Sequence, residues 1–302
     1  MQLFSFSFQA MGSHCECRLA ATTESQAFIF AQMVMNEVGR IENKYSRYRS
    51  HSVLSQINQQ AGLKAVNIDQ ETNELLDYAD VLFRSSGGLF DISSGILRRA
   101  WNFSNPVLPE PWLMESLLTK VGWSKIERDH QHIYLPIPEM EIDFGGFGKE
   151  YAADRVAALL LNAGVQHGLI DLGGDLRILG PQISGDAWQI GIQNPRDAEQ
   201  LIATIPIHSG ALATSGDYER FFEIDGQRYC HILDPTSGYP VHYWQSVSVL
   251  APLSIAAGSY STIAMLKQAE GAAWLAESGL AYLLVDAQGQ IQQCNPQPPS
   301  NS

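Results

Sequence analysis

The stretch from residue 211 to residue 240 restricts the fold of this chain more than any other part of its sequence. Two turn-rich polar motifs, ATSGDY at 213–218 and HILDPTSG at 231–238, enclose a short segment that alternates as an antiparallel hairpin does. Hydroxyls, glycines, an aspartate and a histidine gathered in turns suit an anion site with a proton acceptor beside it. A plain surface hairpin requires none of this chemistry, so the segment predicts both a hairpin and a functional site.

Alternating strands recur along the whole chain, with helices inserted between groups of them. Residues 2–20 alternate as two strands, and further strands are expected near 132–135, 140–143, 168–172, 176–179, 187–192, 201–207, 219–224, 227–232 and 245–250, with two more at the end. Helices are expected at 25–46, from an N-cap at Asp69 to Gly87, after the loop that starts at Trp101, and at 149–163, 254–266 and 271–277. Mostly antiparallel sheets with inserted helices indicate an α+β fold, not a doubly wound sheet.

The composition limits the partners and the compartment. The chain has 302 residues, 45% of them hydrophobic, which is enough for one domain over 1–295 or for two intimately packed halves, with 296–302 as a disordered tail. A net charge of −13 without a Lys/Arg cluster argues against nucleic acid. We expect no membrane span and no signal peptide. The expected location is cytoplasmic as the sequence stands, or periplasmic or membrane-anchored if the N-terminus has been trimmed.

A glycine-rich strand-to-helix junction, DFGGFGK at 143–149, is the second motif that indicates chemistry. Glycines let the backbone approach a ligand closely, and the free N–H groups at a helix start attract anions. The helix dipole contributes only about 0.3–1 kcal/mol per nearby charge, too little to hold a pyrophosphate on so acidic a chain, so a metal is physically attractive. The alternative is that these glycines merely permit a tight turn. The spacing is not the GxGxxG of dinucleotide folds.

His231 is the candidate proton acceptor. It adjoins a polar turn, and histidine has the pKa of a general base near neutral pH. The alternative is a structural histidine.

Together these motifs resemble the ApbE family of FAD:protein FMN transferases almost from end to end. The residues that carry the resemblance are 11–13, 45–49, 52, 54–58, 88–92, 143–154, 173–175, 188–195, 214–216 and 231–240. Short blocks in the right order over so much of the chain make a chance match very unlikely.

The resemblance implies a metal-dependent enzyme, usually with Mg²⁺, that transfers the FMN half of FAD to a Thr or Ser hydroxyl of a partner flavoprotein and releases AMP. It implies that His231 is the base and that the FAD site is lined by Met11, Tyr48, Leu89, Phe90, Asp91, Asp143, Lys149 and Leu233. Other roles are open for several of them: Met11 and Leu233 as core residues, Tyr48 as a buried tyrosine, Asp91 and Asp143 as turn caps, and Lys149 as a solvated helix-start lysine.

The metal ligands implied by the resemblance are Gly146, through its carbonyl, and Thr262, with Ser261 as a neighbouring oxygen. The sequence departs from the family where a ligand aspartate is expected and Gly258 stands instead. Mg²⁺ gains much from an anionic oxygen ligand, so its loss should weaken binding. Glu150 either compensates in part or is a solvated first-turn acid.

This departure leaves two alternatives to the transferase. One is an FAD-binding homologue with weakened or lost transfer, which Gly258 suggests. The other is an FAD pyrophosphatase in which water replaces the acceptor hydroxyl.

Overall fold

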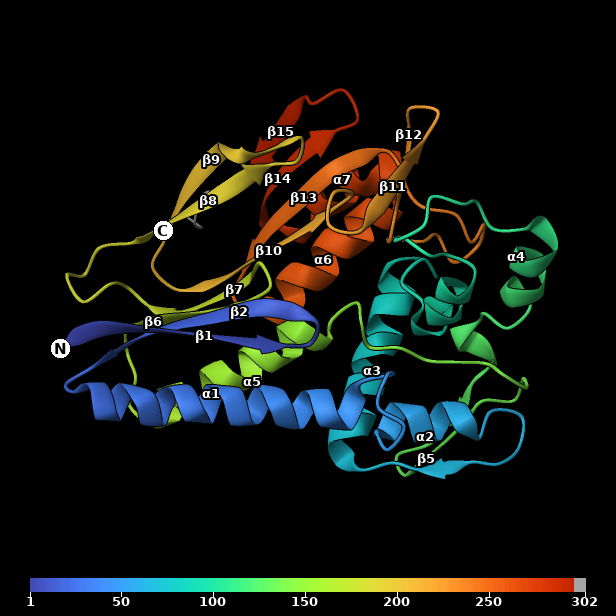
Figure 1. The fold of residues 1–302 in the computed structure, drawn as a ribbon, viewed down its shortest axis with the longest axis horizontal. Helices are drawn as coiled ribbons and strands as arrows, with labels where there is room; N and C mark the ends of the chain where they lie inside the picture. The colour runs from blue at the N-terminus through green and yellow to red at the C-terminus, as the bar shows by residue number, and fades with distance from the viewer. Residues whose placement is uncertain (296–302) are drawn as a thin grey trace.

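The computed structural model describes residues 1–295 (Figure 1), so the expected disordered tail, 296–302, lies outside the described residues. At its centre is an eight-stranded sheet in the order β1-β2-β6-β7-β10-β13-β14-β15, with every neighbouring pair antiparallel. The strands are β1 Gln2–Ala10, β2 Ser13–Ala21, β6 Gly168–Leu172, β7 Asp175–Gly180, β10 Gly210–Gly216, β13 Trp244–Ala251, β14 Ala281–Asp286 and β15 Ile291–Cys294. The α+β fold with mostly antiparallel sheets is therefore confirmed.

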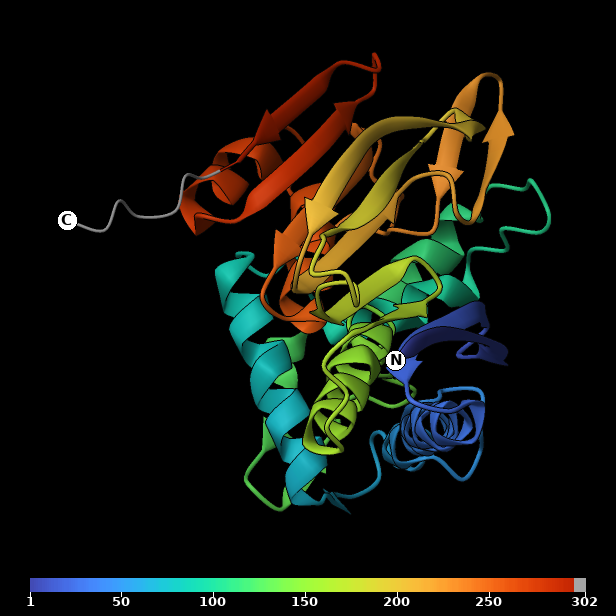
Figure 2. The same cartoon turned by 90° about the vertical axis from the view of Figure 1, so that its left-hand side faces the viewer.

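Helices cover one face of this sheet (Figure 2). Helix α1 packs on β1 and β2, α5 on β6 and β7, and α6 on β10 and β13, and α5 also packs against both α1 and α6. The helices are α1 Glu24–Tyr45, α2 Val53–Gln59, α3 Gln70–Ser85, α4 Pro111–Leu118, α5 Gly148–Asn162, α6 Ser254–Leu266 and α7 Gly271–Ser278. The contact between α5 and α6 matters most for function, because it brings segments about 100 residues apart side by side.

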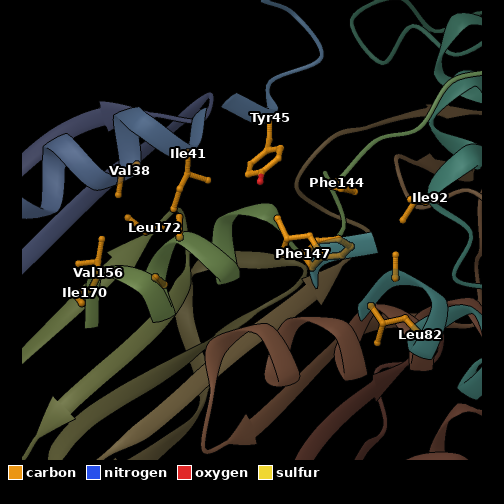
Figure 3. Packing of buried hydrophobic residues seen from close by; sticks show 14 of the residues in the cluster. Val38, Ile41, Tyr45, Leu82, Ile92, Phe144, Phe147, Val156, Ile170 and Leu172 are labelled. Atoms are coloured by element: carbon orange, nitrogen blue, oxygen red, sulfur yellow. The ribbon is translucent and has the colours of Figure 1, made fainter. Parts of the chain in front are cut away.

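Buried aromatic rings fix the glycine-rich junction between α1 and α5 (Figure 3). The ring centroid of Phe144 lies 5.4 Å from that of Tyr45, at the end of α1, and 5.1 Å from that of Phe147, at the start of α5. All three side chains are buried. Tilted aromatic pairs at such distances stabilise by about 0.5–1.5 kcal/mol beyond their buried area, so the junction is held rigidly in place.

Smaller elements complete the molecule. The hairpin of β8 Trp188–Asn194 and β9 Asp197–Ile207 shares a second apolar cluster with β6, β7, β10 and β14. The hairpin of β11 Phe221–Ile224 and β12 Gln227–Cys230 packs with α4 and the 3₁₀ helix η1 Ile92–Arg99 in a third cluster. A small sheet joins β3 Val66–Asn67, β5 His132–Tyr134 and β4 Glu127–Arg128, and two short 3₁₀ turns lie at Trp123–Lys125 and Gln268–Glu270.

The expected elements agree closely with those observed, with one exception. The helix predicted at 254–266 has these bounds, and Asp69 accepts a hydrogen bond from the Thr72 amide as the N-cap of α3. The strand predicted at 140–143 is wrong. The segment joins no sheet: the Asn58 side chain accepts from the Ile142 amide and donates to the Ile142 carbonyl, and the Asp143 amide donates to the Ile92 carbonyl. Among residues 1–295 no helix is both long and apolar enough to cross a membrane.

Candidate functional site

A cavity of about 570 Å³ lies where the β1–β2 turn, the start of α5, the β6–β7 turn and the end of β10 meet. This volume is in the usual range for a small-molecule site. The cavity collects all but one of the site residues predicted from the sequence: Met11, Tyr48, Leu89, Phe90, Asp91, Asp143, Gly146, Lys149, His231, Leu233 and Thr262. Ser261 is the exception, since it is fully buried and does not line the cavity.

The glycine-rich junction forms one wall, and close packing requires a glycine at position 146. A Cβ on Gly146 would lie 2.7 Å from the Cζ atom of the Phe90 ring, too close for any larger residue. Asp143 holds the turn from the other side: one oxygen accepts from the Gly145 amide at 2.9 Å and the other from Arg47 at 3.1 Å. Asp143 therefore caps the turn, and its contact with a flavin or adenosine edge stays a prediction.

Lys149 belongs to the same wall of the cavity, and its ammonium group is ion-paired. Its Nζ lies 2.7 Å from Oδ2 of Asp175, at the start of β7, and the Asp175 carboxylate is buried. Burial, the largest single influence, would lower the pKa of Lys149, but the carboxylates of Asp175, Glu150 and Glu219 together outweigh it and raise that pKa. The ammonium is therefore charged and fixed beside the cavity, where it can attract a phosphate.

Three residues at the edge of the cavity differ in their surroundings. Tyr48 has 81% of its surface exposed, which removes the alternative of a buried tyrosine and leaves its ring free to stack on a ligand. Met11 has a φ of 51°, a left-handed conformation that is uncommon for a residue other than glycine and often marks a functional turn. Asp91 is buried and accepts from Ser93 and from the Trp123 amide, so capping is its observed role.

His231 lies at the end of β12 with its ring against the cavity. Its Nδ1 is buried without a hydrogen-bond partner among the described residues. Burial, together with the guanidinium groups of Arg98 and Arg220, lowers the pKa of His231 to about 4. The imidazole is therefore neutral at pH 7 and able to accept a proton.

Hydroxyl groups from β10 and α6 line another part of the cavity. The Ser215 hydroxyl, near the end of β10, lies 2.8 Å from that of Ser261 and 3.0 Å from that of Thr262. Ser261 also donates to the Gly258 carbonyl, so its oxygen serves the internal bonding of α6. Ser215 was part of a noted motif but had no predicted role. Its contact with Thr262 depends on the packing of α6 against β10, and this long-range packing cannot be predicted from the local sequence pattern.

A carboxylate from α5 holds the start of α6, a role that the sequence analysis missed. Asp154 accepts from the amides of Ser254 and Ile255, both at 2.9 Å, and pairs with Arg177 at 3.0 Å. The signal in the sequence was that Leu253 precedes the helix and has no side chain able to cap it.

Glu150 faces the cavity instead of solvent, so its interpretation as a solvated first-turn acid is wrong. Only 6% of its surface is exposed, and its Oε2 has no hydrogen-bond partner among the described residues. Burial first, and the nearby Asp175 carboxylate second, raise the pKa of Glu150 above its usual range. The side chain lies against Gly258 of α6: a Cβ there would be 2.6 Å from the Glu150 Cγ atom and 2.7 Å from its Cδ atom.

The donor set favours one type of cation. Within residues 1–295 no group of three or more His, Cys, Asp or Glu side chains is arranged to hold a metal. The cavity instead offers the unpartnered Glu150 carboxylate, the Thr262 hydroxyl and the Gly146 backbone carbonyl. Hard oxygen donors in small number suit Mg²⁺, which usually keeps several waters and shares its ligands with substrate phosphates.

Comparisons with known proteins agree with this arrangement. The model of the ApbE family matches residues 11–284. An FAD:protein FMN transferase of Klebsiella pneumoniae is 31% identical over 268 residues, which are 87% of this chain and 82% of the relative. The crystal structure of the ApbE protein of Thermotoga maritima has a TM-score of 0.87 at 30% identity and covers 97% of both chains. The flavinyl transferase ApbE of Pseudomonas stutzeri has a TM-score of 0.86 at 25% identity, covering 98% of this chain and 95% of its own.

Proposed function

This chain belongs to the ApbE family, and from that premise we propose that it is an FAD:protein FMN transferase. It transfers the FMN half of FAD to a Thr or Ser hydroxyl of an acceptor protein and releases AMP. The observation that carries the proposal is one cavity, of a size that suits a nucleotide, lined by a neutral histidine, a fixed lysine and a glycine-rich helix start.

The walls of the cavity match the parts of FAD. The exposed Tyr48 ring offers a stacking surface at the rim for a flat ring system. The free amides at the start of α5 and the Lys149 ammonium attract the pyrophosphate. Leu89, Phe90 and Leu233 supply apolar contact between them.

The chemical step assigns a proton to His231. The acceptor oxygen attacks the phosphorus of the FMN phosphate, a P–O bond to that oxygen forms, and the P–O bond to the AMP phosphate breaks. The hydroxyl proton passes to the neutral imidazole of His231, and AMP leaves with the bond electrons. Positioning and charge stabilisation supply most of the catalysis in phosphoryl transfer of this kind.

The residues present also fit a divalent cation. Glu150 lines the same cavity as Gly146 and Thr262, and one of its carboxylate oxygens has no hydrogen-bond partner among the described residues. A cation bound there would neutralise this carboxylate. Gly146 and Thr262 would hold Mg²⁺, which when bound neutralises the pyrophosphate and improves the leaving group.

The test is direct transfer to a protein. The chain is incubated with FAD, Mg²⁺ and an acceptor protein that the Klebsiella pneumoniae relative flavinylates, with that relative as the positive control. The expected result is a covalently fluorescent acceptor whose mass rises by one FMN, with one AMP released per FMN attached. FMN and AMP produced equally well without acceptor would identify a pyrophosphatase instead. FAD bound with no product, while the relative labels the acceptor, would identify a binding homologue.

A further inference from the structure

We propose that Glu150 supplies the anionic ligand of the divalent cation from α5, in place of a carboxylate from α6 at position 258. This inference rests on the proposed function and names the residue that makes its cation site complete. On this account Gly258 does not mark a lost ligand. It leaves room for the side chain of Glu150, which carries the ligand carboxylate instead.

The first support is steric. The space next to Gly258 is filled by the Glu150 side chain, whose Cγ and Cδ atoms lie 2.6 Å and 2.7 Å from where a Cβ would stand. Real Cβ atoms do not approach other atoms this closely. A carboxylate at one of these two positions therefore excludes one at the other, and both positions direct it to the same region.

The second support is that the Glu150 carboxylate has no ion-pair partner of its own among the described residues. It is 94% buried by surface, and one oxygen has no hydrogen-bond partner among the described residues. Lys149, the cation whose charge acts on Glu150, is already paired with Asp175. Two buried carboxylates thus share one ammonium. Burial of an unpaired carboxylate is costly unless it is neutralised, which a bound cation would do.

The third support is that other oxygen ligands line the same cavity as Glu150. It lines the same cavity as Gly146 and Thr262, and the Thr262 hydroxyl is oriented by its 3.0 Å contact with Ser215. These groups provide a carboxylate, a carbonyl and a hydroxyl, all hard oxygen donors, with the remaining positions left for water and phosphate.

The experiment measures cation binding without any need for turnover. Mn²⁺ is titrated into the protein with saturating FAD, and the free ion is followed by its electron paramagnetic resonance signal, with FAD alone as the blank. We expect Glu150→Gln to raise the Mn²⁺ dissociation constant about tenfold or more, while FAD binding in EDTA changes little. The matched control is Glu37→Gln on α1, also a buried glutamate but ion-paired with Arg40 and outside the cavity, which should keep wild-type Mn²⁺ affinity.

A carboxylate swap tests the shared position. Glu150→Ala opens the space beside residue 258, so combining it with Gly258→Asp should recover most of the lost Mn²⁺ affinity, although Gly258→Asp alone should destabilise the fold. Wild-type Mn²⁺ affinity in Glu150→Gln would overturn the inference, and that conservative variant decides the matter even where the double variant does not fold. A folded double variant that recovers nothing would overturn the shared position.

The two proposals fail separately. Mn²⁺ binding that depends on Glu150 without any acceptor labelling would leave the ligand assignment standing and refute transfer. Acceptor labelling by the wild-type protein, together with unchanged Mn²⁺ affinity in Glu150→Gln, would support transfer and refute the ligand assignment.

Discussion

The Nζ atom of Lys149 lies 2.7 Å from the Oδ2 atom of Asp175, and this pair ties the first turn of α5 to the β6–β7 turn. A Cβ on Gly173, in that turn, would come within 3.7 Å of the same Nζ. The lysine is therefore not the solvated helix-start residue that its sequence position also allowed. It is a fixed positive charge in the wall of the cavity, available to a phosphate group.

Removing this lysine should affect both stability and binding. Lys149→Ala leaves the buried Asp175 carboxylate unpaired, which should lower the free energy of unfolding by about 2 kcal/mol, less than for a fully buried pair because the lysine is partly exposed. It should also weaken FAD binding. Adding Asp175→Asn should restore stability, measured by urea unfolding, but not FAD affinity, measured by flavin fluorescence. Recovery of both properties together would mean that the lysine acts only through Asp175.

His231 should control the rate of transfer without controlling FAD binding. His231→Gln removes the proton acceptor, so the rate should fall by about 10²- to 10⁴-fold with FAD affinity nearly unchanged. Steady-state kinetics and fluorescence titration measure the two effects. His208→Gln, at an exposed site away from the cavity, is the control and should keep the wild-type rate.

The pH dependence of transfer follows from the low pKa of His231. Since burial and two nearby arginines lower this pKa to about 4, the base stays neutral well below pH 6.5. The plateau of kcat/KM should extend from neutral pH down to about pH 5 and fall as the pH approaches 4. An acid limb centred near 6.5, the ordinary value for histidine, would contradict this description of the site.

Protein stability should change in the same pH window. The unfolded chain protonates His231 near pH 6.5 and the folded chain only near 4, so between these values the unfolded state binds more protons. The contribution of the neutral histidine to the free energy of unfolding is therefore fully present above about pH 6.5 and decreases as the pH falls toward 4. Between pH 7.5 and pH 5, urea unfolding should show a smaller loss of unfolding free energy for His231→Gln than for wild type, by about 2 kcal/mol.

The contact between Gly146 and Phe90 predicts a strong steric effect. Gly146→Ala would force its methyl group against the Phe90 ring, and overpacking of this kind costs about 1–3 kcal/mol. Combining it with Phe90→Leu should cost less than the sum of the two single changes in unfolding free energy. Strict additivity would show that the ring and the glycine do not press on each other.

Local patterns predicted most of the fold because they depend on neighbours in sequence. The Asp69 cap and the bounds of α6 were correct for this reason. The strand predicted at 140–143 failed because both backbone groups of Ile142 bond to the Asn58 side chain, 84 residues away, and not to a strand. An alternating pattern indicates an extended backbone but not what that backbone bonds to.

The same distinction applies to the candidate site. The motifs named residues that the fold brings into one cavity, with Ser261 as the exception. The position of Glu150 was beyond the sequence, because a helix-start glutamate is usually solvated and its burial depends on the packing of α5 against α6. Gly258 indicated a missing carboxylate, and only the structure shows what fills its space.

The position of the cation in a complex with FAD tests the central claim most directly. In crystals grown with FAD and Mn²⁺, the anomalous scattering of manganese locates the ion in a difference map. We expect one peak in the cavity at about 2.1–2.2 Å from a Glu150 carboxylate oxygen, with the Gly146 carbonyl, the Thr262 hydroxyl and FAD phosphate oxygens completing its shell. A peak that contacts the FAD phosphates but lies beyond bonding distance of Glu150 would contradict the account.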